Sequence, residues 1–460
     1  MGLCLSHSIS VPEDPVYPSN HTIKIQEKDQ NGRINRLTPI NFTIPGPISN
    51  KTLQAEINHF SYFISASILP GFDPRGMMNN SCMDNLFLIT ENDSVFAGLF
   101  DGHGRDGLKI VEFSSKFMQD FFRKNSAFIK ENPKEMIENM FHQCDEAVQN
   151  SSDLDCATSG TTATIIYLNE NGLYSASVGN SRAVLASFPK ENEEVQQGIK
   201  NNKNKYKRTI EPSRVLKEMA ITVDQKPNHQ EEYERIIQAG GKIQQLADSQ
   251  GKTSGPYRIW KKFGNLPGLT ISRSIGDSIA KEIGVISTPI SQFFEIFPDQ
   301  DQFIIVGSDG IWEALSNIEA VNFVEKFRKK CLRNPPVIKE YPTRKNNSTI
   351  AQLVGEEARY RWFDICEQDD VVIDDISVII IEISTTSPVT QISVNNSERK
   401  TIKFKSFAYE NDPNWNPSAV NQKLVKGTTV MSSEDPLGVE SILNEVVKEE
   451  EEGKEEEKDE

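Results

Sequence analysis

The order of the apolar segments along the chain is the feature that most constrains its fold. Runs of strand-like composition outnumber segments with helical spacing of apolar residues, and the two kinds do not alternate one by one. Parallel strands need a crossover connection, usually a helix, between them. The order therefore favours antiparallel sheets with helices outside. Strands are predicted at residues 60–69, 85–90, 94–100, 161–168, 173–186, 219–223, 303–307 and 376–383, and helices at 109–122, 133–148, 230–239, 318–328 and 348–359.

The ends of the chain differ from its middle in composition. Residues 1–55 are polar and punctuated by proline, which predicts an extended or disordered leader. One domain is expected over residues 56–385, with a lysine- and asparagine-rich surface insertion at 188–215. The apolar pattern then dissolves, so residues 386–460 are expected to form a tail. Residues 448–460 hold nine acidic residues and three lysines, which is typical of a solubilising segment.

Charge and cysteine usage exclude several classes of protein. The formal net charge of -16 argues against a nucleic-acid-binding protein, because such a protein needs a basic face. The six cysteines form no CxxC pair, which indicates free thiols in a reducing compartment. No stretch approaches the roughly 20 apolar residues that span a bilayer, and the start lacks the apolar run of a signal peptide. The sequence therefore predicts a cytoplasmic protein.

The first residues carry a lipidation signal. The start MGLCLS fits the myristoylation pattern, with Gly2 as the acceptor and Ser6 at the required spacing, and Cys4 offers a site for a palmitoyl chain. Two chains anchor a protein stably, whereas one alone is marginal. The pattern predicts a lipid anchor on the inner face of a membrane, and the alternative is a chance match to a short motif.

Three aspartates stand at the ends of apolar runs: Asp101 in VFAGLFDGHG, Asp309 in FIIVGSDGIWE and Asp374 in VVIDDISVIIIEI. Taken singly, each is better explained as a turn residue after a strand. Taken together in one cleft, they would need a cation to offset their mutual repulsion. Oxygen ligands alone favour Mg²⁺ or Mn²⁺ over zinc. His103, in DGHG, is then placed to act as a general acid, the alternative being a histidine of a surface loop.

The candidate residues lie within a series of eight sequence blocks that follow one another along the chain. They are LFDGHGRDG, SGTTATIIYL, SASVGNSRAVL, ITVDQKPNHQEEYERIIQAGGKI, GPYRIW, PGLTISRSIGDSIAKEIGVISTP, IIVGSDGIWEALSN and DDISVIII. With these blocks the chain resembles the metal-dependent protein serine/threonine phosphatases of type 2C, from about residue 60 to 383. The resemblance implies an α+β fold, a four-layer α/β/β/α sandwich of two antiparallel sheets flanked by helices. It also implies a substrate-selecting flap region at residues 225–266.

The resemblance further implies a site with two Mg²⁺ or Mn²⁺ ions and phosphoprotein substrates. Asp101 would bridge both ions, the Gly102 carbonyl would bind one of them, and Asp309 and Asp374 would hold the other. A water acidified by the ions would attack the phosphorus of phosphoserine or phosphothreonine. His103 would then protonate the departing oxygen.

Four positions near this site decide how far the resemblance extends. Asp84 is kept as a further predicted metal ligand, but Met83 stands where an acid or glutamine is usual. Asn180 replaces an aspartate, and Glu313 stands where a second aspartate is common. The last two positions help hold a weaker third metal in relatives. Loss of an outer-shell partner costs about 10–100-fold in affinity or activity, so these changes favour an attenuated enzyme.

Two rival hypotheses remain open at the level of the sequence. One is a degenerate phosphatase that acts as a scaffold or interaction protein on the same fold. The other is a membrane-tethered adaptor that acts chiefly through its terminal segments.

Overall fold

The computed structural model describes residues 20–28, 34–43, 48–71, 82–91, 93–189, 215–248, 250–297, 299–333, 349–365 and 372–385. The chain divides into two compact units, Met1–Ala408 and Tyr409–Glu460, and the second lies outside the described residues. The predicted lipidation site, most of the expected insertion at 188–215 and nearly all of the expected tail also lie outside them. Among the described helices, none combines the length and apolar character needed to cross a membrane.

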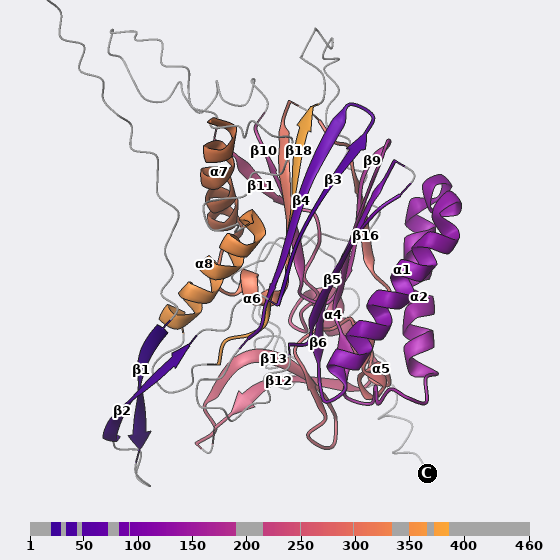
Figure 1. Ribbon diagram of the computed structural model, residues 1–460. Coiled ribbons are helices and arrows are strands. Elements are labelled where there is room, and N and C mark those ends of the chain that lie inside the picture. The colour runs from indigo at the N-terminus through magenta and orange to yellow at the C-terminus, as the bar shows by residue number, and fades with distance from the viewer. Residues whose placement is uncertain are drawn as a thin grey trace, which may run out of the picture. The chain divides into compact units, whose positions relative to one another are not determined.

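Two antiparallel sheets form the centre of the first unit (Figure 1). The six-stranded sheet runs in the order β11 (Lys217–Ala220), β10 (Arg182–Ser187), β17 (Asp301–Gly307), β18 (Ile376–Thr385), β4 (Phe60–Leu69) and β3 (Ser49–Ile57). The seven-stranded sheet runs in the order β15 (Ile275–Gly276), β7 (Gly160–Thr161), β6 (Val95–His103), β8 (Ala163–Asn169), β9 (Gly172–Val178) and β16 (Ile290–Phe294), and β5 (Asp84–Thr90) pairs with β6.

Helices cover the outer face of each sheet. Helices α1 (Gly107–Glu131) and α2 (Pro133–Gln149) pack on the seven-stranded sheet, and α7 (Asn317–Arg333) and α8 (Ile350–Ile365) pack on the six-stranded one (Figure 1). The predicted four-layer sandwich is therefore confirmed.

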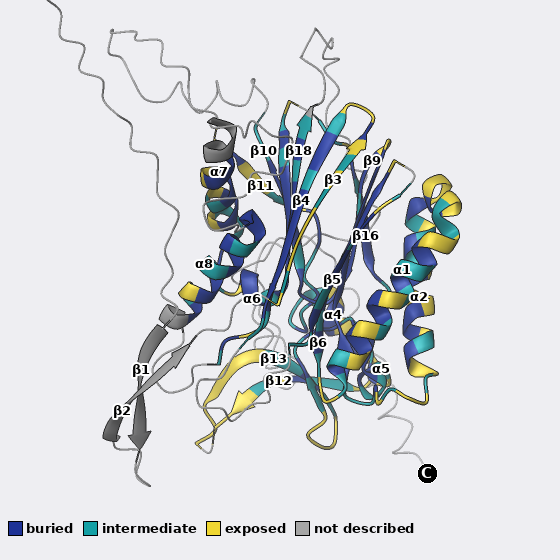
Figure 2. Ribbon diagram, in the orientation of Figure 1, coloured by how far each residue is buried: buried dark blue, intermediate teal, exposed yellow. Residues whose placement is uncertain are grey.

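Alternation along the strands builds the core between these layers. In β17, Ile304 and Val306 point between the two sheets, whereas Phe303 and Ile305 pack against the helix layer. Successive side chains of a strand point to opposite faces. Both faces are covered here, which explains why the sequence of β18 is apolar almost without interruption (Figure 2).

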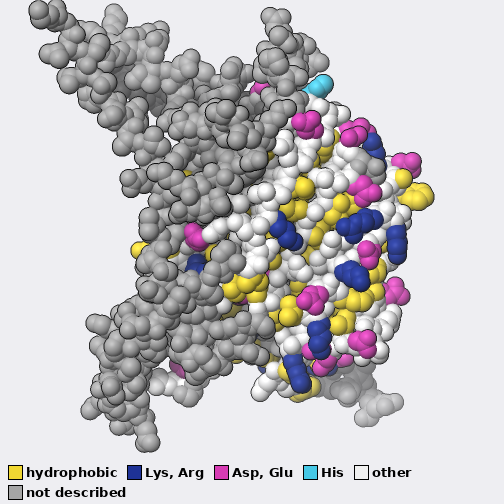
Figure 3. Space-filling view, viewed as in Figure 1, with side chains coloured by type: hydrophobic (Ala, Val, Ile, Leu, Met, Phe, Trp, Pro, Cys, Tyr) yellow, Lys and Arg dark blue, Asp and Glu magenta, His cyan; other side chains and the backbone are white. Residues whose placement is uncertain are grey.

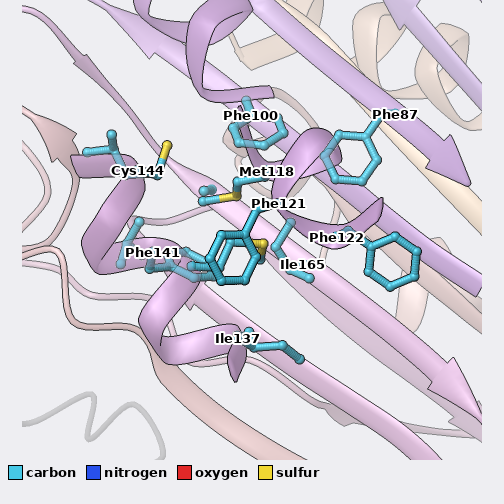
Figure 4. Close-up of a cluster of buried hydrophobic side chains, with 14 of the residues drawn as sticks. Phe87, Phe100, Met118, Phe121, Phe122, Ile137, Phe141, Cys144 and Ile165 are labelled. Carbon is cyan, nitrogen blue, oxygen red and sulfur yellow. The ribbon is translucent and has the colours of Figure 1, made fainter. Parts of the chain in front are cut away.

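The outer core beneath α1 and α2 is rich in aromatic residues (Figure 4). The rings of Phe96 on β6 and Phe122 on α1 stack with centroids 4.2 Å apart. Buried residues of α1 recur at the spacing of one helix face, so the helix presents a single apolar stripe to the sheet. Burying each such ring fully contributes about 1.5–3 kcal/mol.

A smaller, three-stranded sheet follows helix α4 (Gln230–Gln238) in the segment expected as the flap region. It consists of β12 (Gly241–Ala247), β13 (Thr253–Lys261) and β14 (Pro267–Leu269), and we call it the small sheet. A short helix, α5 (Ser278–Lys281), lies against β13 and β14. The sequence did not predict these strands, because their residues are largely polar and exposed.

The structure corrects the predicted leader. Strand β3 begins at residue 49 and pairs with β4 along its whole length, and β1 (Asn20–Lys28) pairs with β2 (Ile34–Thr43). The prediction of an extended or disordered leader is therefore wrong for residues 20–28, 34–43 and 49–55, which form paired strands, and the expected domain start at residue 56 falls inside β3. Most side chains of this edge strand are not buried, so backbone hydrogen bonds hold it without an apolar pattern.

The prediction of one strand over residues 173–186 is also wrong. Strands β8 and β9 form a hairpin, with Asn169 opposite Gly172. The chain then turns at Gly179, whose φ of 99° lies in the region that favours glycine. Strand β9 belongs to one sheet and β10 to the other, so this turn carries the chain across the sandwich.

Candidate functional site

Two neighbouring strands bring the first pair of predicted site residues together. Asp84 opens β5 and Asp101 lies near the end of β6, and the antiparallel register sets them directly opposite each other. Directly opposed residues have Cβ atoms about 4.5–5.5 Å apart. Strand pairing alone therefore places these two carboxyl groups side by side.

The second pair comes from the other sheet. Asp309 begins the short helix α6 (Asp309–Trp312) directly after β17, and Asp374 lies just before β18. The amide of Ser308 donates to the carbonyl of Ser377 at 3.0 Å. The amide of Ser377 donates back to Ser308 Oγ at 2.9 Å. These bonds join the two loops, so both acids stand at the same end of the six-stranded sheet.

Electrostatic coupling shows that the two pairs form one group, which we call the acidic cluster: Asp84, Asp101, Asp309 and Asp374. Burial, followed by the charge of Asp309, raises the pKa of Asp101 well above its usual range. Burial, followed by the charge of neighbouring Asp375, does the same to the pKa of Asp84. Burial and the charge of Asp309 raise the pKa of Asp374 to about 8. Buried acids of like charge disfavour one another's ionisation.

The acidic cluster fits hard divalent cations by charge and donor type. Both carboxylate oxygens of Asp84 and Oδ1 of Asp309 are buried, and no described residue donates to them with normal hydrogen-bond geometry. A buried carboxylate needs a proton, a hydrogen-bond donor or a cation. Oxygen-only ligands suit Mg²⁺ or Mn²⁺. Among the described residues, however, no three His, Cys, Asp or Glu side chains are already gathered as a metal-binding group.

His103 ends β6 beside this cluster and contacts a carboxylate that the sequence analysis did not single out. Its Nε2 lies 2.8 Å from Oδ2 of Asp277. The side chain of His103 is 27% exposed, whereas that of Asp277 is 1% exposed. Burial by itself lowers the pKa of His103, but the charge and hydrogen bond of Asp277 outweigh it, so the pKa is raised. A raised pKa keeps the imidazole protonated to higher pH, as a general acid requires.

The strand ladder holds Asp277 in place. Gly160 of β7 pairs with His103 on one side and with Gly276 on the other. A Cβ atom on Gly160 would come within 2.3 Å of Asp277 Oδ2, so only glycine permits this approach. The Gly276 amide donates to buried Asp145 at 2.9 Å, and Ser274 Oγ donates to Asp277 Oδ2 at 2.6 Å.

Asn180 and Glu313 both lie near Asp309. Asn180 is buried, and its Nδ2 donates to Oδ2 of Asp309 at 2.8 Å. Asn180, which stands where the family that the sequence resembles has an aspartate, is therefore a neutral hydrogen-bond donor to the predicted metal ligand Asp309. Glu313 lies one helical turn after Asp309, with its amide donating to the Asp309 carbonyl at 2.8 Å. Although the residue is exposed, desolvation of its carboxylate and the charge of Asp309 raise its pKa.

Met83 supports the site through its backbone. Its amide donates to Oδ2 of Asp375 at 2.8 Å, and its carbonyl accepts the Gly102 amide at 3.2 Å. Its thioether lies against Gly107, at the start of α1: a Cβ there would be 2.9 Å from the sulfur. Met83 thus links the strand that carries Asp101 and Gly102 to the loop before β18, while its side chain packs against a helix.

Asp277 is the functional candidate that the sequence analysis missed. It lies 174 residues after His103, so spacing gives no sign of their contact. The available signal was its place in SRSIGD, within one of the eight blocks.

Comparisons with known proteins agree with this geometry. Residues 76–336 match the family model described as "Protein phosphatase 2C". "Probable protein phosphatase 2C 64" of Oryza sativa subsp. japonica is 28% identical over 356 residues, which cover 75% of this chain and 71% of the relative. "Probable protein phosphatase 2C 34" of Arabidopsis thaliana is 32% identical over 260 residues, which cover 52% of this chain and 64% of the relative.

A solved structure supports the fold. The serine-threonine phosphatase 2C from Toxoplasma gondii has a TM-score of 0.50 with this chain at 16% identity, and the match covers 73% of this chain and 99% of that one. The resemblance inferred from the eight sequence blocks is confirmed.

Proposed function

Because the chain belongs to the protein phosphatase 2C family of metal-dependent protein serine/threonine phosphatases, we propose that it hydrolyses phosphoserine and phosphothreonine in proteins at the acidic cluster. The observation that carries the proposal is the meeting of four acids from two sheets beside a histidine whose pKa is raised. Such perturbed groups gather at functional sites.

The acidic cluster would hold two Mg²⁺ or Mn²⁺ ions through Asp84, Asp101, Asp309 and Asp374, with the carbonyl of Gly102 as a further ligand. When bound, these ions would supply an acidified water as the nucleophile. Burial and mutual repulsion raise the pKa values of Asp84, Asp101 and Asp374, so in the metal-free protein these carboxyls hold their protons to higher pH than exposed aspartates do. Binding of the ions therefore releases protons.

His103 would act as the general acid for the leaving seryl or threonyl oxygen. Asp277 occupies Nε2 of its ring at 2.8 Å, which leaves Nδ1 as the nitrogen for proton transfer. The carboxylate favours the protonated imidazole and fixes the orientation of the ring. Asp277 is thus a positioning residue, acting through His103.

The neutral residues at two positions would attenuate the site without abolishing it. Asn180 satisfies one oxygen of Asp309 by hydrogen bonding but adds no charge for an accessory ion. Met83 offers no acceptor beside Asp84, although its backbone still supports the strand end. The ligands of the acidic cluster itself are unchanged, so activity should need more cation but should persist.

The test is a titration of Mn²⁺ against the hydrolysis of a phosphoserine peptide by the full chain. Asp309→Asn should lower the rate by about 10²-fold or more, because cation stabilisation of the reaction is worth several kcal/mol. Asp120→Asn is the matched control, since Asp120 lies on α1 and is 49% exposed. Hydrolysis that survives thorough chelation, or equal effects of the two substitutions, would contradict the proposal.

A further inference from the structure

The small sheet concentrates positive charge in an acidic protein. The chain has 66 acidic and 50 basic residues, yet the stretch from 241 to 269 holds five basic residues and one acidic residue. That acid, Asp248, accepts the amides of Gln250 and Lys252 at 2.9 Å and is therefore engaged in its own turn. The small sheet therefore carries a net positive charge, whereas the whole chain carries a net negative charge.

One face of the small sheet is buried and the other is partly exposed. Ile243 of β12 lies opposite Ile259 of β13, and both are buried. The neighbouring positions in the register pair Lys242 with Trp260. Because side chains alternate along a strand, Lys242, Trp260 and Arg258 lie on the opposite face. We call this face, together with Lys252 and Lys262 at the adjoining turns, the basic face.

The aromatic and guanidinium groups of the basic face are held in place. Trp260 packs on Gly268 of β14, and its Nε1 donates to the carbonyl of Gln244 at 3.2 Å. Arg258 donates to the Gly268 carbonyl at 2.7 Å. Lys242, Lys252 and Lys262, in contrast, form no ion pair with any described residue. Within the described structure, these three lysine charges therefore lack an acidic partner, whereas Trp260 and Arg258 are fixed.

Large apolar side chains adjoin the basic face and have no cover within the described structure. Phe263 is 86% exposed and Leu266 is 52% exposed, both in the turn between β13 and β14. Leu246 of β12 is 49% exposed. Figure 2 shows the outer parts of β12 and β13 as exposed. Exposed apolar groups rimmed by charge mark interaction surfaces.

The small sheet, of which the basic face is one side, lies near the proposed site. Strands β13 and β14 lie against α5, and Nζ of Lys261 lies 2.7 Å from Oε2 of Glu282, just after that helix. Helix α5 follows directly on Asp277, which contacts His103. Because Lys261 alternates with Trp260, α5 lies on the side of Ile259, and the basic face is the outer face of a sheet that borders the proposed site.

We propose that the basic face docks an acidic segment of the phosphoprotein, so that the enzyme selects phosphorylated residues flanked by Asp and Glu. This inference rests on the proposed function for substrate use but predicts peptide binding even without turnover. Complementary charge raises the rate and specificity of encounter. Screening over about 8 Å at physiological ionic strength makes such docking sensitive to salt.

The experiment compares two labelled phosphoserine peptides of equal length, one with Glu and one with Ala around the same core. Fluorescence anisotropy with the full chain in EDTA measures binding, and kcat/KM with Mn²⁺ measures substrate use. The test variant carries Lys242→Glu, Lys252→Glu and Lys262→Glu. The control variant carries Lys116→Glu and Lys124→Glu on α1, where charges of both signs are mixed over the surface (Figure 3).

Wild type should bind the acidic peptide about ten-fold or more tightly than the neutral one, as expected for several exposed charge pairs together. The test variant should lose this preference and the control variant should keep it. Equal binding of both peptides by wild type would overturn the proposal, as would equal loss in the two variants. Binding to anionic lipid vesicles serves as a further measurement. If the test variant loses vesicle binding but keeps its preference for the acidic peptide, the proposal is also overturned. Peptide preference without any turnover would refute the proposed function and leave the docking surface standing.

Discussion

Asp277→Asn is the substitution that tests the proposed chemistry most directly. The change keeps the size of the side chain and removes its charge. Oδ2 of Asp277 now accepts from His103 at 2.8 Å and from Ser274 at 2.6 Å. A neutral amide keeps one oxygen acceptor and cannot favour the protonated imidazole as a carboxylate does. We therefore expect His103 to lose both its orientation and the raised pKa.

The size of the effect follows from what His103 supplies. A positioned general acid contributes about 10²–10⁴-fold to the rate. Loss of a residue that orients a functional group by hydrogen bonding typically lowers affinity or activity by about 10–100-fold. Because Asp277→Asn leaves the imidazole of His103 in place, the loss of activity should be near the upper end of the 10–100-fold range. We expect kcat for a phosphoserine peptide to fall by about 10²-fold.

The assay compares leaving groups. A seryl oxygen must be protonated as it departs, whereas p-nitrophenolate is already a stable anion at neutral pH. Asp277→Asn should therefore lower kcat for the phosphoserine peptide far more than kcat for p-nitrophenyl phosphate. It should also move the alkaline limb of the peptide profile to lower pH, because the acid form of His103 is lost once the pH passes its lowered pKa.

A matched variant separates positioning from folding. Ser274→Ala removes the second hydrogen bond to the same carboxylate and leaves the His103 contact intact. Either change at this buried site costs about 1–3 kcal/mol of stability. Ser274→Ala should lower the rates for both substrates by the same factor. If Asp277→Asn also does so, with no shift in the pH profile, Asp277 has only a structural role and the reasoning fails.

Three further outcomes are expected. In EDTA, the pKa of Asp374 is raised from 3.8 to about 8, so the protonated carboxyl favours the folded state at low pH and this stabilisation is lost as the pH rises from about 4 towards 8. The thermal midpoint should therefore fall over this pH range, and it should fall less in Asp374→Asn. Asn180→Asp replaces an amide donor 2.8 Å from Asp309 with a like charge; it should lower the midpoint in EDTA but raise Mn²⁺ affinity, while Asp101→Asn lowers the rate at every Mn²⁺ concentration. Gly2→Ala should move the protein from membranes to the soluble fraction, and unchanged fractionation would refute the lipid prediction.

The fold class and the family could be predicted from the amino-acid sequence, because both leave local signals in it. Buried strands must be apolar on their covered faces, so β4 was predicted with the observed bounds at residues 60–69. Acids at strand ends, read with the order of the eight blocks, identified Asp101, Asp309 and Asp374 as candidates. An edge strand such as β3 leaves no such signal, since its stability comes from backbone pairing.

Which functional groups contact one another depends on the three-dimensional fold. The register of β5 and β6 sets Asp84 opposite Asp101. The ladder through Gly160 brings Asp277 to His103 across 174 residues. Alternation on the small sheet gathers Lys242, Arg258 and Trp260 on one face. Sequence spacing records distance along the chain, whereas electrostatic and hydrogen-bond energies depend on distance in space, and pairing between strands fixes that distance.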